Sequence, residues 1–267
     1  MKIDVVVCTK NSAQTVKHVL ERILKYVPLN RLIIIDGLSK DGTIDIVKKF
    51  GAEIYSDQGK GLGYARNMAL NLVETKIFAF IDSDVLIPGN WFTLIKHLKH
   101  EKVAAANGFT AFGLNHPILK ALSKYQLKNR RYKPLNFSNT LLKIEPVLKV
   151  GGIRKNLPSH EDTELHSRLI KHGFTWVVDK HVIAYHPRTL KEHMAHIKWW
   201  GKGDRAVGRS QLTYLYSIIR SLGSGLNLAL QAHPALIICF PLLQLNRYLG
   251  YLEEAKEEKI RCPQKNI

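Results

Sequence analysis

The stretch IFAFIDSDVLIP, residues 77–88, joins a run of five apolar residues to two aspartates that stand one residue apart. The run Ile77–Ile81 is short and is rich in β-branched and aromatic residues, which predicts a buried strand. Asp82 and Asp84 follow directly at the carboxyl end of that strand. The fold is therefore expected to bring two like charges to the end of a buried strand.

On both sides of this stretch, short apolar runs alternate with segments of helical periodicity. This alternation is typical of βαβ units and a largely parallel sheet. Beyond about Arg188 only helices are expected. We predict an α/β fold with a Rossmann-like, mixed and mostly parallel sheet flanked by helices, and a helical C-terminal appendage. The predicted domains are a catalytic domain over residues 1–190 and a helical region over residues 191–267. Strands are expected at 3–8, 32–35, 53–55, 77–81, 103–106, 140–144 and 175–178, and helices at 12–26, 43–50, 62–73, 91–100, 117–130 and 162–172.

The composition is globular and strongly basic. Apolar residues make up 45% of the 267 residues, and 40 Lys and Arg against 22 Asp and Glu give a net charge of +18. Such a charge indicates an anionic partner, which could be nucleic acid, nucleotide phosphate or an acidic membrane surface. Between Lys102 and Lys143 there are eight basic residues and no acid, although any one of them could simply belong to a solvated surface.

The cysteines and the N-terminus bear on the compartment. Three cysteines without a CxxC pattern argue against a disulfide scaffold or a cysteine-zinc site and favour a reducing compartment. The N-terminus reads as a strand and lacks the apolar core of a signal peptide. We therefore expect a cytoplasmic location.

Ligands of an open α/β sheet bind beyond the carboxyl ends of the strands. The sequence places Thr9, Asn11 and Asp36 there. Asp36 could accept hydrogen bonds from a nucleotide base or ribose, or it could close a turn. In GKGLGYARN, residues 59–67, glycines allow close backbone approach, and Lys60 and Arg66 can meet phosphate. The segment matches neither the phosphate-loop nor the dinucleotide fingerprint.

Asp82 and Asp84 would repel each other unless a cation lies between or beside them. Mg²⁺ or Mn²⁺ removes that cost, because these ions take oxygen ligands and complete their shell with water and substrate phosphates. A turn with a helix N-cap is the structural alternative. His186, in VIAYHPRT at residues 182–189, follows a short predicted strand and is either a third metal ligand or a structural histidine.

The segment PSHEDTEL, residues 158–165, carries the remaining acidic cluster. Ser159 and Asp162 fit a capping box, which would only start a helix. Glu161 and Glu164 are not explained by that capping box, and Asp162 and Glu161 are the candidate catalytic residues. A carboxylate at a helix start that faces a bound substrate is well placed to act as a general base.

Taken in order, these motifs resemble those of the family 2 inverting glycosyltransferases of the GT-A fold, over about residues 1–186. The matching segments are VVVCTKN, IIIDGLSKDGT, GKGLGYARN, FIDSDV, HEDTEL and YH. The sequence differs at Gly37, where the family usually has a second aspartate, and HIKWWGKG, residues 196–203, only loosely resembles the family's acceptor segment. The resemblance implies a hexosyltransferase that uses a nucleotide diphosphate sugar as donor. It also implies a nucleoside pocket at Thr9 and Asp36 with Arg66 close by, a DxD motif at Asp82 and Asp84 that holds ribose and a divalent metal, a base at Asp162, and a metal-binding histidine at His186.

The acceptor is expected to be lipid-linked or a glycan, presented at the cytosolic face of an anionic membrane. Between Lys180 and Leu252 nine basic residues stand against two acids, and Trp199, Trp200, Tyr214 and Tyr216 add interfacial aromatics. Residues 221–246 contain no Asp, Glu, Lys or Arg. This stretch predicts an interfacial or re-entrant helical hairpin, with a buried helical pair as the alternative.

Two other functions compete with sugar transfer. A nucleic-acid-binding protein would use the basic run 120–133 to follow phosphates, but it would leave the strand-end aspartates without a purpose. A nucleotidyltransferase would also bind magnesium through carboxylates. We expect a nucleotide-sugar donor and no nucleic-acid partner.

Overall fold

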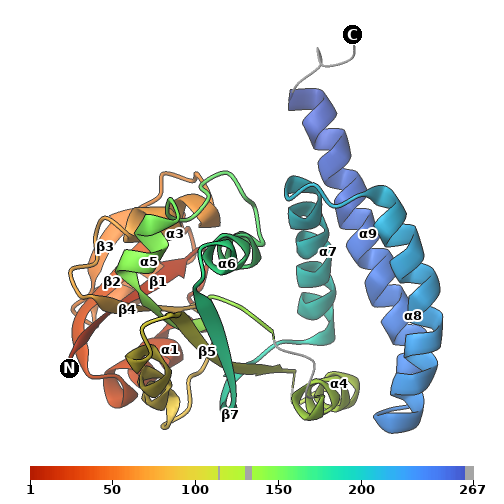
Figure 1. Cartoon of the computed structure of the whole chain (residues 1–267), viewed down its shortest axis with the longest axis horizontal. Coiled ribbons are helices and arrows are strands. Elements are labelled where there is room, and N and C mark those ends of the chain that lie inside the picture. Colours follow the sequence, from red (N-terminus) through yellow and green to blue (C-terminus); the bar gives the residue numbers. More distant parts are fainter. Residues whose placement is uncertain (114, 130–133, 262–267) are drawn as a thin grey trace. The chain divides into compact units, whose positions relative to one another are not determined.

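The computed structural model describes residues 1–113, 115–129 and 134–261. The chain divides into two compact units, and each is described by itself (Figure 1). The sheet unit comprises residues 1–111, 131–156 and 161–187, and the helical unit comprises residues 112–130, 157–160 and 188–267. The helical unit is thus discontinuous in sequence, while the limits 1–190 and 191–267 for functional domains stay a prediction.

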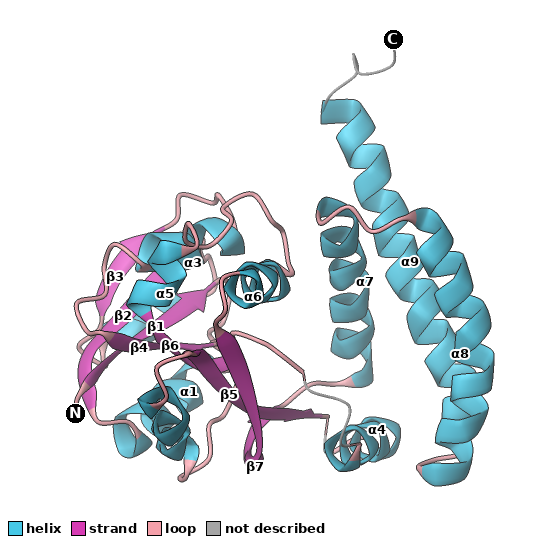
Figure 2. Ribbon diagram, viewed as in Figure 1, coloured by secondary structure: helices cyan, strands magenta, loops and turns pink. Residues whose placement is uncertain are grey.

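The sheet unit is built on one seven-stranded sheet in the order β3-β2-β1-β4-β6-β5-β7 (Figure 2). Strand β1 pairs in parallel with β2 and β4, and β2 pairs in parallel with β3, whereas β6 runs antiparallel to both β4 and β5. The predicted mixed, mostly parallel sheet is therefore confirmed. The strands are β1 (Ile3–Thr9), β2 (Leu29–Asp36), β3 (Glu53–Ser56), β4 (Ile77–Ile81), β5 (Val103–Phe112), β6 (Asn139–Lys143) and β7 (Thr175–His186).

Helices cover both faces of this sheet because its central strands are apolar on both faces. In β1, Val5 and Val7 pack on one side, and Val6 packs on the other. The first side receives α1 (Val16–Tyr26), α2 (Thr43–Lys48) and the 3₁₀ helix η1 (Trp91–Lys99). The second side receives α3 (Leu62–Ala69), α5 (Ile144–Lys149) and α6 (Glu161–Lys171). Burial on both faces leaves the carboxyl ends of the strands as the place where polar side chains can gather.

Two predicted strands are much longer than expected. Strand β5 continues to Phe112 and β7 continues to His186. The predicted strand ended at Val178, but β7 continues through Asp179, whose buried carboxylate accepts hydrogen bonds within the sheet unit. Its Oδ2 lies 3.0 Å from Lys96 Nζ and 2.8 Å from His97 Nε2. These partners satisfy the charge, so the strand passes through it.

The helical unit contains α7 (Leu190–Ala206), α8 (Gln211–Gln231) and α9 (Leu236–Arg261), which form the predicted helical C-terminal appendage, and also α4 (Pro117–Lys128), which lies between β5 and β6 in the sequence. Helix α9 packs against both α7 and α8. Glycines set the distance between α7 and α9. A Cβ atom on Gly201 would lie 1.8 Å from the Arg247 carbonyl oxygen, and one on Gly250 would lie 1.8 Å from the Lys198 carbonyl oxygen. The backbones of α7 and α9 can therefore come into contact only because Gly201 and Gly250 have no side chain.

A buried carboxylate ties the helical unit together. Asp204 of α7 accepts hydrogen bonds from Arg247 Nε of α9 at 2.5 Å and from the Tyr214 hydroxyl of α8. Arg209 Nη1 lies 3.1 Å away, and His160 Nε2 lies 3.3 Å from Asp204 Oδ1. Burial lowers the pKa of His160 to about 4, so its imidazole is neutral at physiological pH.

The uncharged residues 221–246 span the second half of α8, the turn and the first half of α9. None of the described helices is long and apolar enough to cross a membrane.

Candidate active site

The predicted nucleoside residues meet where β1 and β2 end side by side. Thr9 and Asp36 are paired in the parallel register, and Thr9 Oγ1 donates a hydrogen bond to Asp36 Oδ1 at 2.9 Å. Ser39 donates to the same carboxylate through its backbone N–H at 2.8 Å and its hydroxyl at 2.6 Å. Asn11 joins the two loops, because its backbone N–H donates to Ser39 Oγ and its Oδ1 accepts from the Lys40 N–H. Asp36 thus closes a turn within its own loop, and a role in nucleoside binding stays a prediction.

Asp57 shapes the glycine-rich loop from within. Its carboxylate accepts the backbone N–H groups of Gly59 at 2.7 Å and Gly61 at 3.2 Å, and both glycines adopt positive φ angles of 74° and 98°. Asp57 lies directly after β3, which ends at Ser56. Lys60 is exposed on this loop, and its ammonium lies 4.7 Å from the centroid of the Tyr64 ring. The loop therefore holds Lys60 out toward solvent.

Arg66 links two motifs that are far apart in the sequence. Its side chain is 5% exposed and its guanidinium lies 5.0 Å from the centroid of the Phe137 ring. Nη2 donates to Asp82 Oδ1 at 2.6 Å, and Nη1 forms an ion pair with Glu161 Oε1. Within the described residues, the other Glu161 oxygen is buried without a hydrogen-bond partner. A single buried cation thus holds the carboxylates of the FIDSDV and HEDTEL segments in one cluster.

Asp162 follows Glu161 directly at the start of α6. Burial and then the Glu161 charge raise the pKa of its carboxyl, Arg66 acts in the opposite direction, and the result is a pKa of about 7. Its Oδ1 accepts the backbone N–H of Thr163 at 2.6 Å. A carboxylate with a pKa near the working pH can both take up and release a proton, which is what a general base requires.

The expected capping box at the start of α6 is wrong. The helix begins at Glu161, and the Ser159 hydroxyl lies 2.9 Å from Nδ1 of the neighbouring His160. His160 has a φ angle of 68°, in the left-handed region, directly before the helix. The acidity of Asp162 therefore does not serve to cap α6 through Ser159.

Asp84 and His186 form the candidate metal site. Leu86 and Tyr185 exchange backbone hydrogen bonds of 2.8 and 2.9 Å, which bring the loop after β4 beside the end of β7. As a result, Asp84 Oδ2 and His186 Nε2 lie 3.1 Å apart. Two neighbouring ligands of an octahedral ion, each about 2.1 Å from the metal, are separated by about 3.0 Å, so this pair fits one Mg²⁺ or Mn²⁺ ion. Among the described residues no three His, Cys, Asp or Glu side chains could hold a metal ion, and Asp82 is engaged by Arg66.

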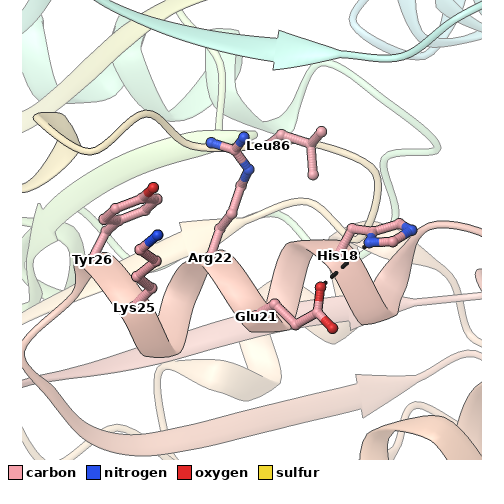
Figure 3. Close-up of a pocket in the computed structure, with 6 residues that line it drawn as sticks. All are labelled: His18, Glu21, Arg22, Lys25, Tyr26 and Leu86. Atoms are coloured by element: carbon pink, nitrogen blue, oxygen red, sulfur yellow. Dashed lines mark hydrogen bonds and ion pairs between the residues drawn. The ribbon is translucent and has the colours of Figure 1, made fainter.

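Two nearby features do not belong to this chemistry. Burial raises the pKa of the Cys8 thiol to about 12, so it is no thiolate nucleophile at neutral pH. A hollow of about 370 Å³ lies on α1, lined by His18, Glu21, Arg22, Lys25, Tyr26 and Leu86 (Figure 3). It includes none of the predicted site residues, and Arg22 Nη1 is committed to the Ile87 carbonyl oxygen at 2.8 Å.

The sequence model of the family described as Glycosyl transferase family 2 matches residues 4–145, which is more than half of the chain. This chain belongs to glycosyl transferase family 2. The match covers β1 to β6 and includes the strand-end residues from Thr9 to Asp84. Family 2 membership confirms the resemblance inferred from the motifs, and it favours sugar transfer over the nucleotidyltransferase and nucleic-acid-binding alternatives.

Known proteins of similar sequence and fold agree with this family. The succinoglycan biosynthesis protein ExoA of Rhizobium meliloti (strain 1021) is 26% identical in an alignment of 213 positions that covers 69% of this chain. The chain spans 63% of the length of that relative. The mannosyltransferase PcManGT of Pyrobaculum calidifontis, solved with GDP-Man and Mn²⁺, superposes with a TM-score of 0.73 at 15% identity, over 96% of this chain and 88% of that one. Glucosyl-3-phosphoglycerate synthase of Mycobacterium tuberculosis, solved with Mn²⁺, UDP and glucosyl-3-phosphoglycerate, gives a TM-score of 0.52 at 21% identity, over 73% and 75% of the two chains. These structures confirm the predicted GT-A-type fold.

Proposed function

We propose that this family 2 enzyme transfers a sugar from a nucleotide diphosphate sugar to an acceptor with inversion, and that the reaction requires Mg²⁺ or Mn²⁺. The observation that carries the proposal is the Arg66 cluster, which holds Asp82 and Glu161 together directly before Asp162, a carboxyl whose pKa burial raises to about 7. The structural relatives solved with GDP-Man or UDP and with Mn²⁺ support the same donor class and metal.

The donor side of the reaction is assigned to the strand ends. Thr9, Asn11 and Asp36 hold the nucleoside, and Asp82 contacts the ribose while Arg66 fixes its carboxylate. Lys60, exposed on the glycine-rich loop, reaches a phosphate oxygen. These residues bind and orient the donor, because backbone N–H groups, hydroxyls and carboxylates at strand ends point toward the same edge of the sheet.

Asp84 and His186 would hold the divalent metal, whose charge stabilises the leaving nucleoside diphosphate. Asp84 Oδ2 and His186 Nε2 lie 3.1 Å apart, which is close to the spacing of two neighbouring ligands of such an ion. The exposed fraction of the Asp84 side chain is 42%, and that of His186 is 12%. The more exposed carboxylate is accordingly the group that meets the donor.

Asp162 removes the proton from the attacking group of the acceptor. The pKa of about 7 leaves a large fraction of its carboxyl ionised at neutral pH, and the bound proton is retained once it is taken up. Attack from the side opposite the leaving diphosphate gives inversion in a single displacement. Glu161 holds Arg66 and raises the pKa of Asp162, so it supports the base without contacting the acceptor.

The acceptor is proposed to be a lipid-linked phosphate or glycan at the cytosolic face of a membrane, with the protein bound peripherally. Nine basic residues against two acids between residues 180 and 252 support contact with an anionic surface. The similarity to a protein of succinoglycan biosynthesis supports a glycan product. A soluble polysaccharide or protein acceptor would take its place if vesicles had no effect on transfer.

A donor screen tests the central proposal. The full chain is heated with a set of nucleotide sugars, each with and without Mn²⁺, and the matching donor should raise Tm because it binds only the folded state. Release of nucleoside diphosphate from that donor indicates sugar transfer, whereas release of pyrophosphate would indicate nucleotidyl transfer. Asp162→Asn should keep the Tm shift and lose release, with the exposed Asp45→Asn as a matched control that keeps both. Normal turnover by Asp162→Asn would remove the base from the mechanism.

A further inference from the structure

The outer face of α8 carries an uninterrupted row of large apolar side chains. Six of them recur every three or four residues and so share one face of the helix. More than half of each is exposed: Leu212 77%, Tyr216 64%, Ile219 69%, Leu222 60%, Leu226 51% and Leu230 80%. The 18 steps from first to last cover about 27 Å at 1.5 Å per residue. We call these six residues the α8 stripe.

The face of α8 that is buried in the protein is less apolar than the stripe. It consists of Tyr214, Ser221, Gly225 and Leu228, and the hydroxyl of Tyr214 is taken by Asp204. At Gly225 the backbone approaches α9, because a Cβ atom there would lie 3.1 Å from the Ile237 carbonyl oxygen. A helix that packs only inside a protein places its large aliphatic residues inward. In α8 the large aliphatic residues lie on the exposed face, which suits contact with a partner outside the protein.

Helix α9, which packs along α8 in the helical unit, repeats the pattern (Figure 1). Ile238, Leu242, Leu245 and Leu249 follow the same spacing of three or four residues and are 43–66% exposed. Exposed apolar patches of this extent mark an interaction surface. The hairpin therefore offers apolar side chains from both of its helices.

The charges around the hairpin select the partner. No acid occurs between Asp204 and Glu253, and four arginines lie in that interval. Arg209 and Arg247 pair with the buried Asp204, and Arg205 donates to the Tyr251 hydroxyl, so the charge offered beside the stripe is that of Arg220. Arg220 is exposed on α8 and lies one residue after Ile219 of the stripe. A net charge of +18 makes two copies of the chain repel each other, which disfavours a dimer as the occupant. An apolar stripe with arginine and no acid matches a surface that is apolar inside and anionic at its headgroups.

We propose that the α8 stripe, extended by the exposed row of α9, docks the protein side-on against an anionic lipid surface. The six side chains enter the boundary between headgroups and acyl chains, while Arg220 reaches the lipid phosphates. The opposite face of α8 stays packed on α9. The inference rests on the proposed function only for its purpose, which is to hold the enzyme where a lipid-linked acceptor is presented. Docking itself needs neither donor nor metal.

Flotation with vesicles tests the docking surface. The full chain is mixed with vesicles of phosphatidylcholine containing 30% phosphatidylglycerol, or of phosphatidylcholine alone, without donor and at low and high salt. Wild type should float with the anionic vesicles and lose at least tenfold in partitioning with the neutral ones. Ile219→Glu and Leu226→Glu should each reduce partitioning at least tenfold. Leu148→Glu is the matched control, because Leu148 is 52% exposed on α5 and lies outside the hairpin.

The outcomes separate docking from catalysis. Each variant must keep the wild-type Tm, and hydrolysis of the donor in the absence of acceptor should be the same in Ile219→Glu as in wild type. Absence of flotation by wild type, or flotation of both stripe variants at the wild-type level, overturns the docking proposal. A concentration-dependent dimer that Ile219→Glu dissociates, without vesicle binding, assigns the stripe to a second copy instead. Flotation by a protein whose Tm no nucleotide sugar raises, with or without Mn²⁺, leaves docking intact and counts against the proposed function alone.

Discussion

Replacing Glu161 by glutamine should move the acid limb of the pH–rate profile to lower pH. The charge of Glu161 raises the pKa of Asp162, and Arg66 lowers it. Glutamine removes the negative charge of Glu161, which raises the pKa of Asp162. The positive charge of Arg66, which lowers this pKa, is then opposed by one carboxylate fewer. Glutamine also keeps an acceptor oxygen for the Arg66 guanidinium, so the cluster retains one of its hydrogen bonds.

The size of the effect follows from the titration of Asp162. With a pKa of about 7, the wild-type value of kcat/KM should fall about tenfold for each pH unit below that point, because only the ionised carboxylate can accept a proton. Each unit by which the substitution lowers the pKa corresponds to about 1.4 kcal/mol and raises the rate at pH 5 about tenfold relative to wild type. Weaker hydrogen bonding to Arg66 should at the same time cost about 2 kcal/mol of stability.

The assay is the initial rate of nucleoside diphosphate release between pH 5 and pH 9, at acceptor concentrations below KM. Glu164→Gln is the control, because Glu164 lies in the same helix but pairs with Arg168 at 2.6 Å and Arg154 at 2.7 Å. Its acid limb should coincide with that of wild type. An acid limb of Glu161→Gln that stays in place, or that moves to higher pH while the variant remains folded, would refute the assignment of Asp162 as the base.

Three further predictions concern the metal, the stability and the helix packing. Asp84→Ala should lose the Mn²⁺-dependent part of the donor-induced Tm shift, while EDTA should abolish wild-type turnover until Mn²⁺ is restored; an unchanged Mn²⁺ response would exclude Asp84 as a ligand. Because the folded pKa of Asp162 lies above its ordinary value of 3.8, wild type should lose stability as pH rises from about 4 to 7. Asp162→Asn should therefore gain in Tm over wild type across that interval, and a constant difference would contradict the raised pKa. Gly201→Ala should destabilise the protein by about 3 kcal/mol in urea unfolding, because its Cβ would overlap the Arg247 carbonyl oxygen, whereas Gly223→Ala, which meets nothing within 4 Å, should be neutral or stabilising by up to about 1 kcal/mol.

Much of the sheet follows from local pattern. The strand Ile77–Ile81 has the limits that its apolar run predicted, since both of its faces are buried and polar residues end it. The predicted end of a strand was wrong where residues distant in sequence satisfy the charge of a buried polar side chain. Asp179 reads as the end of a strand, yet Lys96 and His97 satisfy its charge and β7 continues to His186.

For the candidate site, too, one part could be predicted from the sequence and another could not. Its residue types could be predicted because ligands of an open α/β sheet bind beyond the carboxyl ends of the strands, where these carboxylates, glycines and the histidine stand in the sequence. Which of these side chains pair with one another could not be predicted. The ion pair between Arg66 and Glu161 joins residues that are 95 positions apart, and it appears only when α3 and α6 cover the same face of the sheet. The Asp204 network and the close contact at Gly201 are likewise products of helix packing.

The α/β class, the order of motifs and the residues that carry charge at the strand ends follow from the amino-acid sequence, because they depend on periodicity and on near neighbours. Which carboxylates pair with Arg66, that the pKa of Asp162 rises to about 7, and which face of α8 stays exposed follow from the packing of distant segments. The pKa and the exposed face both depend on burial. A helix that is apolar on nearly every side does not reveal in its sequence which face its neighbours will cover, and a carboxyl acquires its pKa from the charges and the low dielectric that folding brings around it.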